Sequence, residues 1–269
     1  MRTRFLRGTT AENNGLTLPE GELSIDLEKK AVRLHDGQTL GGFEVVGTQS
    51  VMSGSQIIAT DGVVDFYGEV PDTELFTRTE LSTITGMSSG VELSDAGFSW
   101  LKFGFNGKIL FVASKNVRSN VTVNELYNLG LVYGTDTVGA FPPTTGVNQN
   151  TLLTKNNLTF KVRLLNGSVN DPSGAERNVN VFTDGPGSEW DELLKRVHSD
   201  YSPGGDWPTY TNEFLDIKLN RYSFVKETHT HTTYSRIMRG YHGLLGMSSN
   251  IPQWRSSSGC WRPVLELVQ

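Results

Sequence analysis

Two short stretches near the N-terminus alternate apolar and polar residues, and this period of two predicts a β-hairpin. The apolar positions, which would share one face of the hairpin, are Leu23, Ile25, Leu27, Val32 and Leu34. A single hairpin is only marginally stable in water, so this face needs a partner. We therefore assign residues 1–46 to a small β module. We expect its apolar face to be buried against another chain, such as the same segment of a second subunit.

The alternation is lost over residues 47–97, where Gly, Ser, Thr and Asp are dense. One helix is predicted within this stretch, because Thr77 and Glu80 have the spacing of a capping box and Gly86 suits a helix C-terminus. We interpret the stretch as a connector that carries one short helix.

From residue 98 to residue 269 the apolar pattern tightens and predicts an α+β domain. An Asn-Gly pair at 106–107 stands between two apolar runs, which is a strong hairpin signal. Thr122 and Glu125 repeat the capping-box spacing and predict a second helix. Alternating apolar residues over 158–165 predict a strand.

The most regular helical pattern covers residues 188–198. Its apolar positions recur at helical spacing and are Trp190, Leu193, Leu194 and Val197. Ser188 is the expected N-cap of this helix. The remaining sequence predicts short strands, ending with the alternating stretch 261–267, and long loops at 134–151, 166–187 and 241–258.

Composition narrows the possible classes of protein. The 29 glycines and 10 prolines among 269 residues agree with short elements and long loops. The lone cysteine excludes an internal disulfide and a cysteine-rich zinc site. The net charge of −5, without a block of Lys or Arg, argues against nucleic-acid binding. Because no apolar run approaches about 20 residues and the N-terminus lacks a signal peptide, we expect no membrane insertion. We also expect the protein to be made in the cytosol and to leave it only if the cell lyses.

Catalytic motifs are absent from the sequence. It contains no G-x-S-x-G, no P-loop and no H-E-x-x-H, and no spacing of its 29 acidic residues singles out a glycosidase pair. Cys260 precedes Trp261 and is interpreted as a small core residue. We therefore predict that the protein is not an enzyme, with polysaccharide cleavage as the alternative.

Two short segments contain residue types that can bind metal ions. His229 and His231 alternate on one strand face, where Glu227 offers a third ligand, but a solvated edge strand is the more common origin of such a pair. The stretch 170–174 offers oxygen atoms and departs from the calcium-loop motif, which favours a plain turn. We predict neither a metal ion nor another cofactor.

A group of aromatic residues lies in a stretch rich in Pro and Gly, and consists of Tyr201, Trp207, Tyr210 and Tyr222. Such a group can stack on sugars, form a small local core or contact another subunit. The sequence leaves these three interpretations open.

The N-terminal stretch resembles a known family. The segments that carry the resemblance are RGTTAE at 7–12, GELSID at 21–26 and HDG at 35–37. They are similar to the N-terminal domain of the phage major tropism determinant. That module recurs in phage tail-fibre and virion proteins, including some that do not bind receptors.

The residues after 97 resemble a module of predicted phage virion and tail-fibre proteins. The segments concerned are SWLKF at 99–103, FKVRLL at 160–165, SEW at 188–190, RGYHG at 239–243 and WRPVLEL at 261–267. Their order is also similar to the C-type-lectin-like fold of the tropism determinant and of the formylglycine-generating enzyme. The chemistry of that enzyme needs paired cysteines, which Cys260 alone cannot supply.

The resemblance implies both a fold and a function. The fold would be α+β and β-rich, with a small N-terminal β domain and a C-terminal C-type-lectin-like domain, assembled as a homotrimer in a bacteriophage virion. The N-terminal domain would trimerise or dock to other virion proteins, and the C-terminal domain would attach to a receptor on the bacterial surface. The alternative is a purely structural head-fibre, decoration, collar or baseplate protein without receptor binding.

A C-type-lectin-like domain presents ligands from loops on a rigid framework, which favours the loop 241–258 as the receptor-binding surface. The residues expected to bind are Tyr241, His242, Met247, Asn250, Gln253, Trp254 and Arg255. Tyr, Trp and Arg dominate binding hot spots, and Asn and Gln add adaptable hydrogen bonds. Packing of Tyr241 and Trp254 beneath the loop is the competing interpretation.

Overall fold

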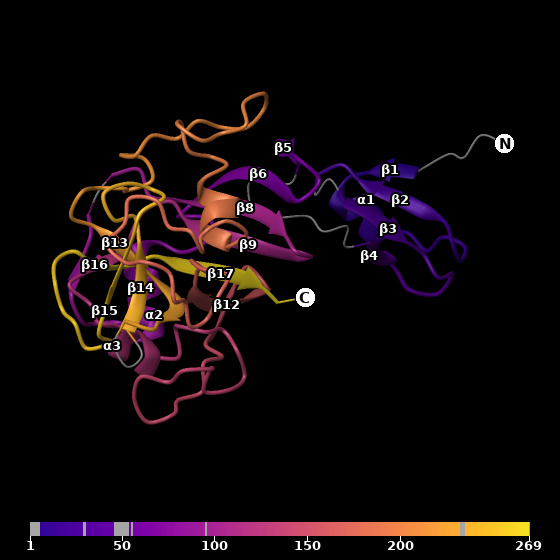
Figure 1. Cartoon of the computed structure of the whole chain (residues 1–269). Helices are drawn as coiled ribbons and strands as arrows, with labels where there is room; N and C mark the ends of the chain where they lie inside the picture. The colour runs from indigo at the N-terminus through magenta and orange to yellow at the C-terminus, as the bar shows by residue number, and fades with distance from the viewer. Residues whose placement is uncertain are drawn as a thin grey trace. The chain divides into compact units, whose positions relative to one another are not determined.

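The computed structural model describes residues 6–28, 31–45, 54, 56–94, 96–231 and 235–268. The chain divides into two compact units, Met1–Val51 and Met52–Gln269 (Figure 1). Within the described ranges, no helix is both long and apolar enough to cross a membrane.

The smaller unit is a four-stranded sheet with one short helix. Its strands in spatial order are β1 (Leu6–Gly8), β2 (Leu23–Asp26), β3 (Ala31–Leu34) and β4 (Phe43–Val45). β1 is parallel to β2, and the other neighbours are antiparallel. The helix α1 (Thr10–Asn14) follows β1 and begins at a capping box formed by Thr9 and Glu12.

The predicted hairpin is β2–β3, but the face that it buries within the chain is the polar one. Leu23 pairs with Leu34, so the apolar residues share a face as predicted, and that face is open. The opposite face is buried and carries Ser24, Asp26, Arg33 and His35. Arg33 donates to Asp26 (3.1 Å) and to the Gly41 carbonyl, and these bonds offset the cost of burying the guanidinium.

The centre of the larger unit is an antiparallel seven-stranded sheet. Its strands in spatial order are β11 (Leu152–Lys155), β12 (Leu158–Leu164), β17 (Pro263–Leu267), β9 (Lys108–Ala113), β8 (Ser99–Phe105), β6 (Val64–Pro71) and β5 (Ala59–Thr60). The predicted Asn-Gly turn joins β8 to β9. Both Asn106 and Gly107 have the positive φ that this turn requires.

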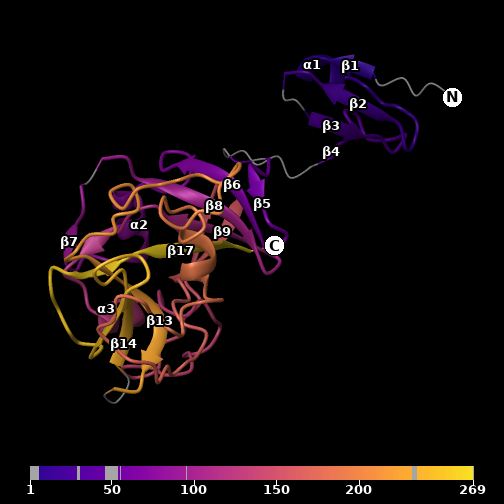
Figure 2. The same ribbon diagram turned by 45° about the horizontal axis from the view of Figure 1, so that its top comes forward.

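The larger unit also contains a six-stranded sheet. Its strands in spatial order are β15 (Met247–Asn250), β14 (Ser235–Arg239), β13 (Tyr222–His229), β16 (Gly259–Trp261), β10 (Arg118–Ser119) and β7 (Val91–Glu92). Figure 2 shows β13 and β14 side by side. The strand predicted over 261–267 is divided at Arg262, because β16 belongs to this sheet and β17 to the other. The fold is therefore β-rich, as predicted, and it contains several sheets.

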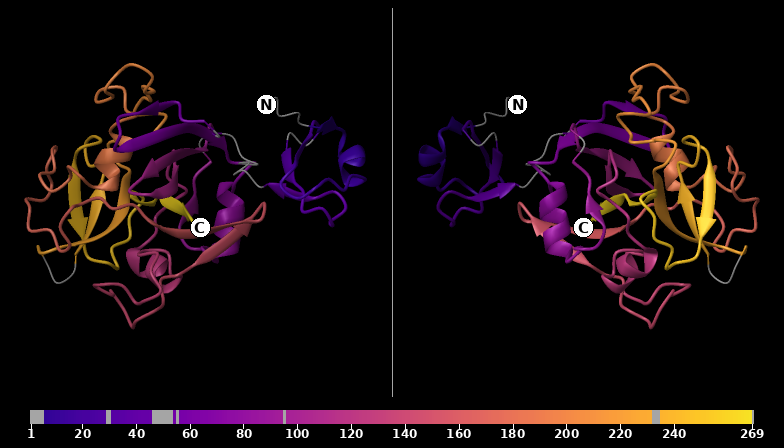
Figure 3. Two further views of the ribbon diagram at one scale, coloured as in Figure 1. Left: turned by 90° about the vertical axis from the view of Figure 1, so that its right-hand side faces the viewer. Right: turned by 90° about the vertical axis from the view of Figure 1, so that its left-hand side faces the viewer.

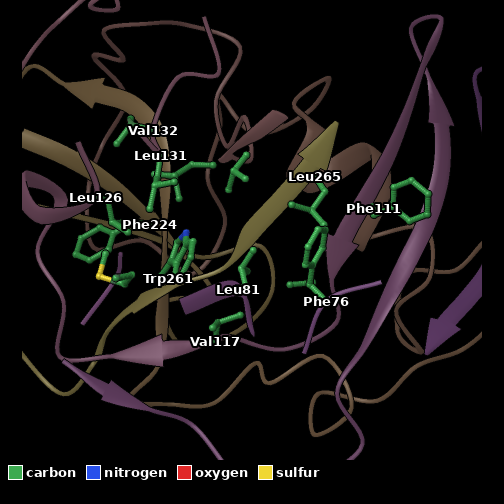
Figure 4. Close-up of a cluster of buried hydrophobic side chains, with 14 of the residues drawn as sticks. Phe76, Leu81, Phe111, Val117, Leu126, Leu131, Val132, Phe224, Trp261 and Leu265 are labelled. Atoms are coloured by element: carbon green, nitrogen blue, oxygen red, sulfur yellow. The ribbon is translucent and has the colours of Figure 1, made fainter. Parts of the chain in front are cut away.

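Two apolar cores cover opposite faces of the seven-stranded sheet. Along β8, Trp100 points into one core and Leu101 into the other, which is the pattern of a strand buried on both faces. The first core also receives Phe224 and Trp261 from the six-stranded sheet (Figure 4). This shared core joins the two sheets into one unit.

The connector predicted over 47–97 is not a separate segment. Residues 47–53 lie outside the described part of the chain, but β6 pairs with β8 along most of its length. Leu81 contributes to the first core. The predicted boundary between 47–97 and 98–269 is therefore wrong, because a long-range strand pairing that local composition does not reveal crosses it.

Both predicted capping boxes begin helices. The helix α2 (Arg78–Thr85) follows Thr77 and ends at Gly86, whose φ of 74° is left-handed. The helix α3 (Val123–Asn128) follows Thr122. In each case a glutamate three residues after the cap closes the box, so short-range chemistry fixes these two positions.

The helix predicted over 188–198 is shorter and wider than expected. A π-helical turn covers Trp190–Leu194, and Ser188 is not its N-cap residue. The four apolar residues of the predicted helical face are nevertheless fully buried. The apolar spacing therefore predicted which side chains point inward but not the width of the turn.

Long loops project from opposite ends of the larger unit (Figure 3). One, coloured rose, is the loop 134–151, and Tyr127 and Tyr133 hold it by donating to the carbonyl oxygens of Val138 and Phe141. The other, coloured orange, is the loop 199–214. Side chains from the framework thus fix long stretches that have little secondary structure of their own.

Candidate functional site

The segment predicted to bind a receptor, 241–258, is partly strand. β15 lies within it, at the edge of the six-stranded sheet, and a turn and an irregular stretch flank this strand. His242 lies in the turn, is exposed and has a positive φ of 55°. Met247 is fully buried in the second core, so its assignment to the binding surface is wrong: pairing of β15 with β14 directs this side chain inward.

Three half-buried rings lie along this segment and are called here the aromatic rim: Tyr222, Tyr241 and Trp254. The Tyr241 ring lies 5.3 Å from the Tyr222 ring and 4.2 Å from the His242 ring, between centroids. Trp254 meets Phe224 edge-on at 6.4 Å. Because Tyr222 and Phe224 are two residues apart on β13, their rings are on one face of the sheet.

The aromatic rim combines packing with exposure. Tyr222 and Trp254 pack against the first core, yet neither ring is fully buried. Burial, with a smaller effect of the Tyr241 hydroxyl, raises the pKa of Tyr222 above its ordinary value. The hydroxyl is therefore neutral at physiological pH and can both donate and accept a hydrogen bond.

The polar residues of the segment differ in how far they are engaged. Arg255 donates to the carbonyl oxygen of Asn120 (2.6 Å) and to a carboxylate oxygen of Glu125. Burial opposes ionisation of Glu125, but its hydrogen bonds outweigh that effect and hold its pKa below the ordinary value. Asn250 accepts from the next backbone N–H, and Gln253 is exposed. Arg255 therefore secures the irregular stretch, while Gln253 remains open to solvent.

Two buried arginines in the motifs that resembled phage proteins stabilise the framework. Arg239 donates to Asp191 (2.6 Å) and to the Gly167 carbonyl, and its guanidinium lies over the Trp190 ring. Arg262 donates to two backbone carbonyl oxygens at the end of β9. Burial lowers the pKa of Arg262 to about 10, which still leaves it charged at neutral pH. These roles could not be predicted from the sequence, since burial of an arginine is not visible in a local pattern.

The residues considered for metal binding hold the loop 166–187 instead. The buried His229 has its Nε2 atom 2.7 Å from the Ala175 carbonyl oxygen, and its Nδ1 atom accepts the His231 N–H. Glu227 accepts the Gly167 N–H (2.8 Å), and burial raises its pKa to about 8. Across the described residues, no group of three or more His, Cys, Asp or Glu is placed to hold a metal ion.

The second aromatic group does not form one cluster. Trp207 is buried and stacks on Phe66, while Tyr210 stacks on Phe214 with 4.1 Å between centroids. Tyr201 is partly exposed, and Tyr222 belongs to the aromatic rim. The local-core interpretation holds for Trp207 and Tyr210, because Tyr210 also meets the Phe66 ring edge-on and packs against the second core.

The open face of the N-terminal hairpin has the character predicted for an oligomer contact. Leu27, Val32 and Leu34 are 57%, 38% and 42% exposed, and Leu23 and Ile25 are half-buried. Phe43, which pairs with Leu34 across β3 and β4, is 55% exposed and extends the same face. These six residues are called here the N-terminal apolar face. Phe43 was not predicted to belong to this face, because its strand is short and follows two glycines.

Comparisons with known proteins give one family match. Residues 4–39 match the family model of the Major tropism determinant N-terminal domain. A comparison with curated proteins gives no match.

Similar solved structures include the Major Tropism Determinant M1, U1 and P3c variants. Their sequence identities are 11%, 13% and 12%, and their TM-scores are 0.19, 0.22 and 0.20. Each match covers 99% of this chain and 100% of the other. TM-scores this low carry no fold assignment, so the match over residues 4–39 is the finding on which the functional argument rests.

Proposed function

We propose that the chain is a fibre-type structural protein of a bacteriophage virion, and that its larger unit attaches the particle to a receptor on the host surface. The match of residues 4–39 to the Major tropism determinant N-terminal domain carries this proposal. The role is adhesive and not enzymatic. Its location is the virion, its partners are other virion proteins and further copies of itself, and it uses no cofactor.

The smaller unit assembles the protein in this proposal. Its N-terminal apolar face is open in a single chain. Burial of these six neighbouring apolar side chains against another surface would be favourable, because it removes apolar area from water. We assign that cover to the same face of further copies, in a homotrimer. Docking of this unit to other virion proteins would leave the larger unit available to the host.

The larger unit presents the receptor-binding surface, and we assign it a C-type-lectin-like fold. The proposed contacts are Tyr241, His242, Asn250, Gln253, Trp254 and Arg255, without the buried Met247. Half-exposed Tyr and Trp rings that pack against residues of a rigid sheet supply contact area at a small entropic cost. Tyr222, which packs against Tyr241, joins this set.

A purely structural role in a head fibre, decoration, collar or baseplate is the second candidate. The observation that favours it is the engagement of Trp254 with Phe224 and of Arg255 with Glu125, since both contacts stabilise the unit itself. In that case the aromatic rim would be covered by a neighbouring virion protein.

Adsorption of intact phage to host cells distinguishes the two roles. Phage that carries Tyr241→Ala together with Trp254→Ala should adsorb at least about tenfold more slowly, because hot-spot rings each contribute on the order of 2 kcal/mol. Leu219→Ala, an exposed residue outside the proposed surface, is the matched control and should adsorb normally. Normal adsorption of the double variant, on particles of normal composition, would reject the receptor-binding role.

A further inference from the structure

A small cavity of about 210 Å³ opens beside the π-helical turn of the larger unit. The turn and the loop that follows it contribute Asp191, Glu192, Lys195, Arg196, Tyr201 and Pro203 to its walls. At about 30 Å³ for each water, the cavity has room for about seven waters. It is smaller than the roughly 300–1,000 Å³ of pockets that enclose drug-sized ligands, so its scale is that of one sugar ring.

One cation in the wall of the cavity has no direct ionic partner among the described residues. Asp191 pairs with Arg239 (2.6 Å), and Glu192 and Asp61 both pair with Arg196. The Lys195 ammonium, in contrast, has no ion pair or hydrogen bond with any side chain or backbone group that the structure describes. The cavity therefore offers one ammonium that is free to pair with a ligand, while the two carboxylates in its wall disfavour a ligand that carries two negative charges.

Tyr201 gives the cavity an aromatic wall that is already positioned. Tyr201 is 39% exposed, and the centre of its ring lies 5.3 Å from the centre of the His198 ring. His198 is fixed in turn, because it accepts the Asp200 N–H and is 2.9 Å from the Asn212 side chain. The Lys195 ammonium is 6.0 Å from the centre of the Tyr201 ring. At this spacing, one small ligand can contact the ammonium with a charged group and stack its ring on Tyr201 at the same time.

We propose that this cavity binds one acidic monosaccharide, a sugar ring that carries a single carboxylate. The carboxylate contacts the Lys195 ammonium, and the apolar face of the ring packs against Tyr201. The Glu192 side chain, at the wall, accepts from a ring hydroxyl. Sugar acids suit this site better than neutral sugars because of the free ammonium, and better than phosphates because of the neighbouring carboxylates.

The site adds to the proposed receptor-binding surface and does not depend on it. Two hydrogen bonds connect the segment 241–258 to the framework beside the cavity. The Trp190 indole donates to the Leu244 carbonyl oxygen (2.8 Å), and the Phe182 N–H donates to the Leu245 carbonyl oxygen. The aromatic rim and the cavity can nevertheless be tested one at a time, because no residue belongs to both.

Titration of the full chain with sodium glucuronate, followed by ligand-observed NMR, tests the proposal. We expect saturable binding in the millimolar range, little binding of glucose, and weaker binding of sodium acetate than of glucuronate. Lys195→Met should weaken glucuronate binding by about tenfold, which corresponds to the loss of one charge-assisted hydrogen bond. Lys195→Glu should abolish glucuronate binding. Tyr201→Ala should weaken it by about tenfold, as Lys195→Met does.

Arg177→Met, which removes a half-buried cation that does not line the cavity, is the control and should leave binding unchanged. Failure of the unaltered chain to bind glucuronate, equal binding of glucose or of acetate, or unchanged binding by Lys195→Met would each overturn the proposal. Because no host cell enters this experiment, its failure leaves the adsorption result on the aromatic rim untouched.

Discussion

The two units of the chain bury opposite kinds of side chain. In the larger unit, both faces of the seven-stranded sheet are covered by apolar cores. In the smaller unit, the buried face of the sheet is the polar one, which includes the Arg33–Asp26 pair. The apolar face, with Val32, Leu34 and Phe43, is open. The larger unit therefore buries its apolar sheet faces within one chain, whereas the smaller unit leaves its apolar face uncovered.

This difference indicates how the chain divides its work. A unit whose apolar surface is already buried can be displayed on its own and can hold binding loops in place. A unit whose apolar face is open gains stability when another surface covers that face. The contrast therefore supports assembly by the smaller unit and recognition by the larger one.

The largest expected effect concerns the self-sufficient core. Trp190 is fully buried, and the guanidinium groups of Arg239 and Arg262 both lie over its ring. Trp190→Ala should lower the free energy of unfolding of the larger unit by about 3–5 kcal/mol, because it leaves a cavity and removes both contacts. Calorimetry should show a lower melting temperature for the larger unit only. A shift of the smaller unit's transition as well would break the distinction between the two units.

The next effect is a pH dependence confined to the larger unit. Burial raises the pKa of Glu227 to about 8, so the folded chain retains a proton that the unfolded chain loses near pH 4.5. The stabilising contribution of this carboxyl is therefore complete below about pH 4.5 and is lost as the pH rises through 8. Glu227→Gln should remove this decline and stabilise the unit at pH 9 by up to about 5 kcal/mol. Parallel stability curves for the two proteins between pH 5 and 9 would contradict this assignment.

A smaller effect compares the two faces of the N-terminal sheet. Asp26→Ala leaves the buried Arg33 without its carboxylate and should destabilise the smaller unit by about 1–3 kcal/mol. Leu27→Ser, on the open face, should change the stability of a single chain by less than about 0.5 kcal/mol. Hydrogen exchange of the β2 and β3 amides, measured at low protein concentration, resolves the two. Equal losses of stability for the two variants would contradict the assignment of a buried polar face and an open apolar face.

The smallest effect is expected to be the same in both units. Thr9 and Thr77 each cap a helix through a box closed by a glutamate. Substitution of either by Ala should cost about 1 kcal/mol of the unit that contains it, and substitution by Ser much less. Urea unfolding measures both, and a cost well above 2 kcal/mol at either position would show a role beyond capping.

Features that depend on neighbouring residues were predicted well from the sequence. The capping boxes at Thr77 and Thr122, the turn at 106–107 and the strand over 158–165 all formed as expected. In each, the chemistry that decides the conformation lies within a few residues. The match of residues 4–39 likewise agrees with the resemblance seen in short motifs there.

Features that depend on distant residues were not predicted. Which face of the N-terminal hairpin is covered follows from the pairing of Arg33 with Asp26 and Gly41, and not from alternation. The burial of Met247 follows from the pairing of β15 with β14. The other expected binding residues remain candidates. Asn250 ends β15, and the rest lie in the turn and the irregular stretch beside it: Tyr241, His242, Gln253, Trp254 and Arg255. Their contacts with a receptor are not visible in a local pattern.

Sedimentation equilibrium of the full chain tests most directly the claim that the smaller unit is incomplete alone. The account predicts the mass of three chains for the unaltered protein, and a lower mass for Val32→Asp, whose charge cannot be buried in a subunit contact. The mass of a single chain for the unaltered protein, at concentrations of tens of micromolar and above, would contradict it.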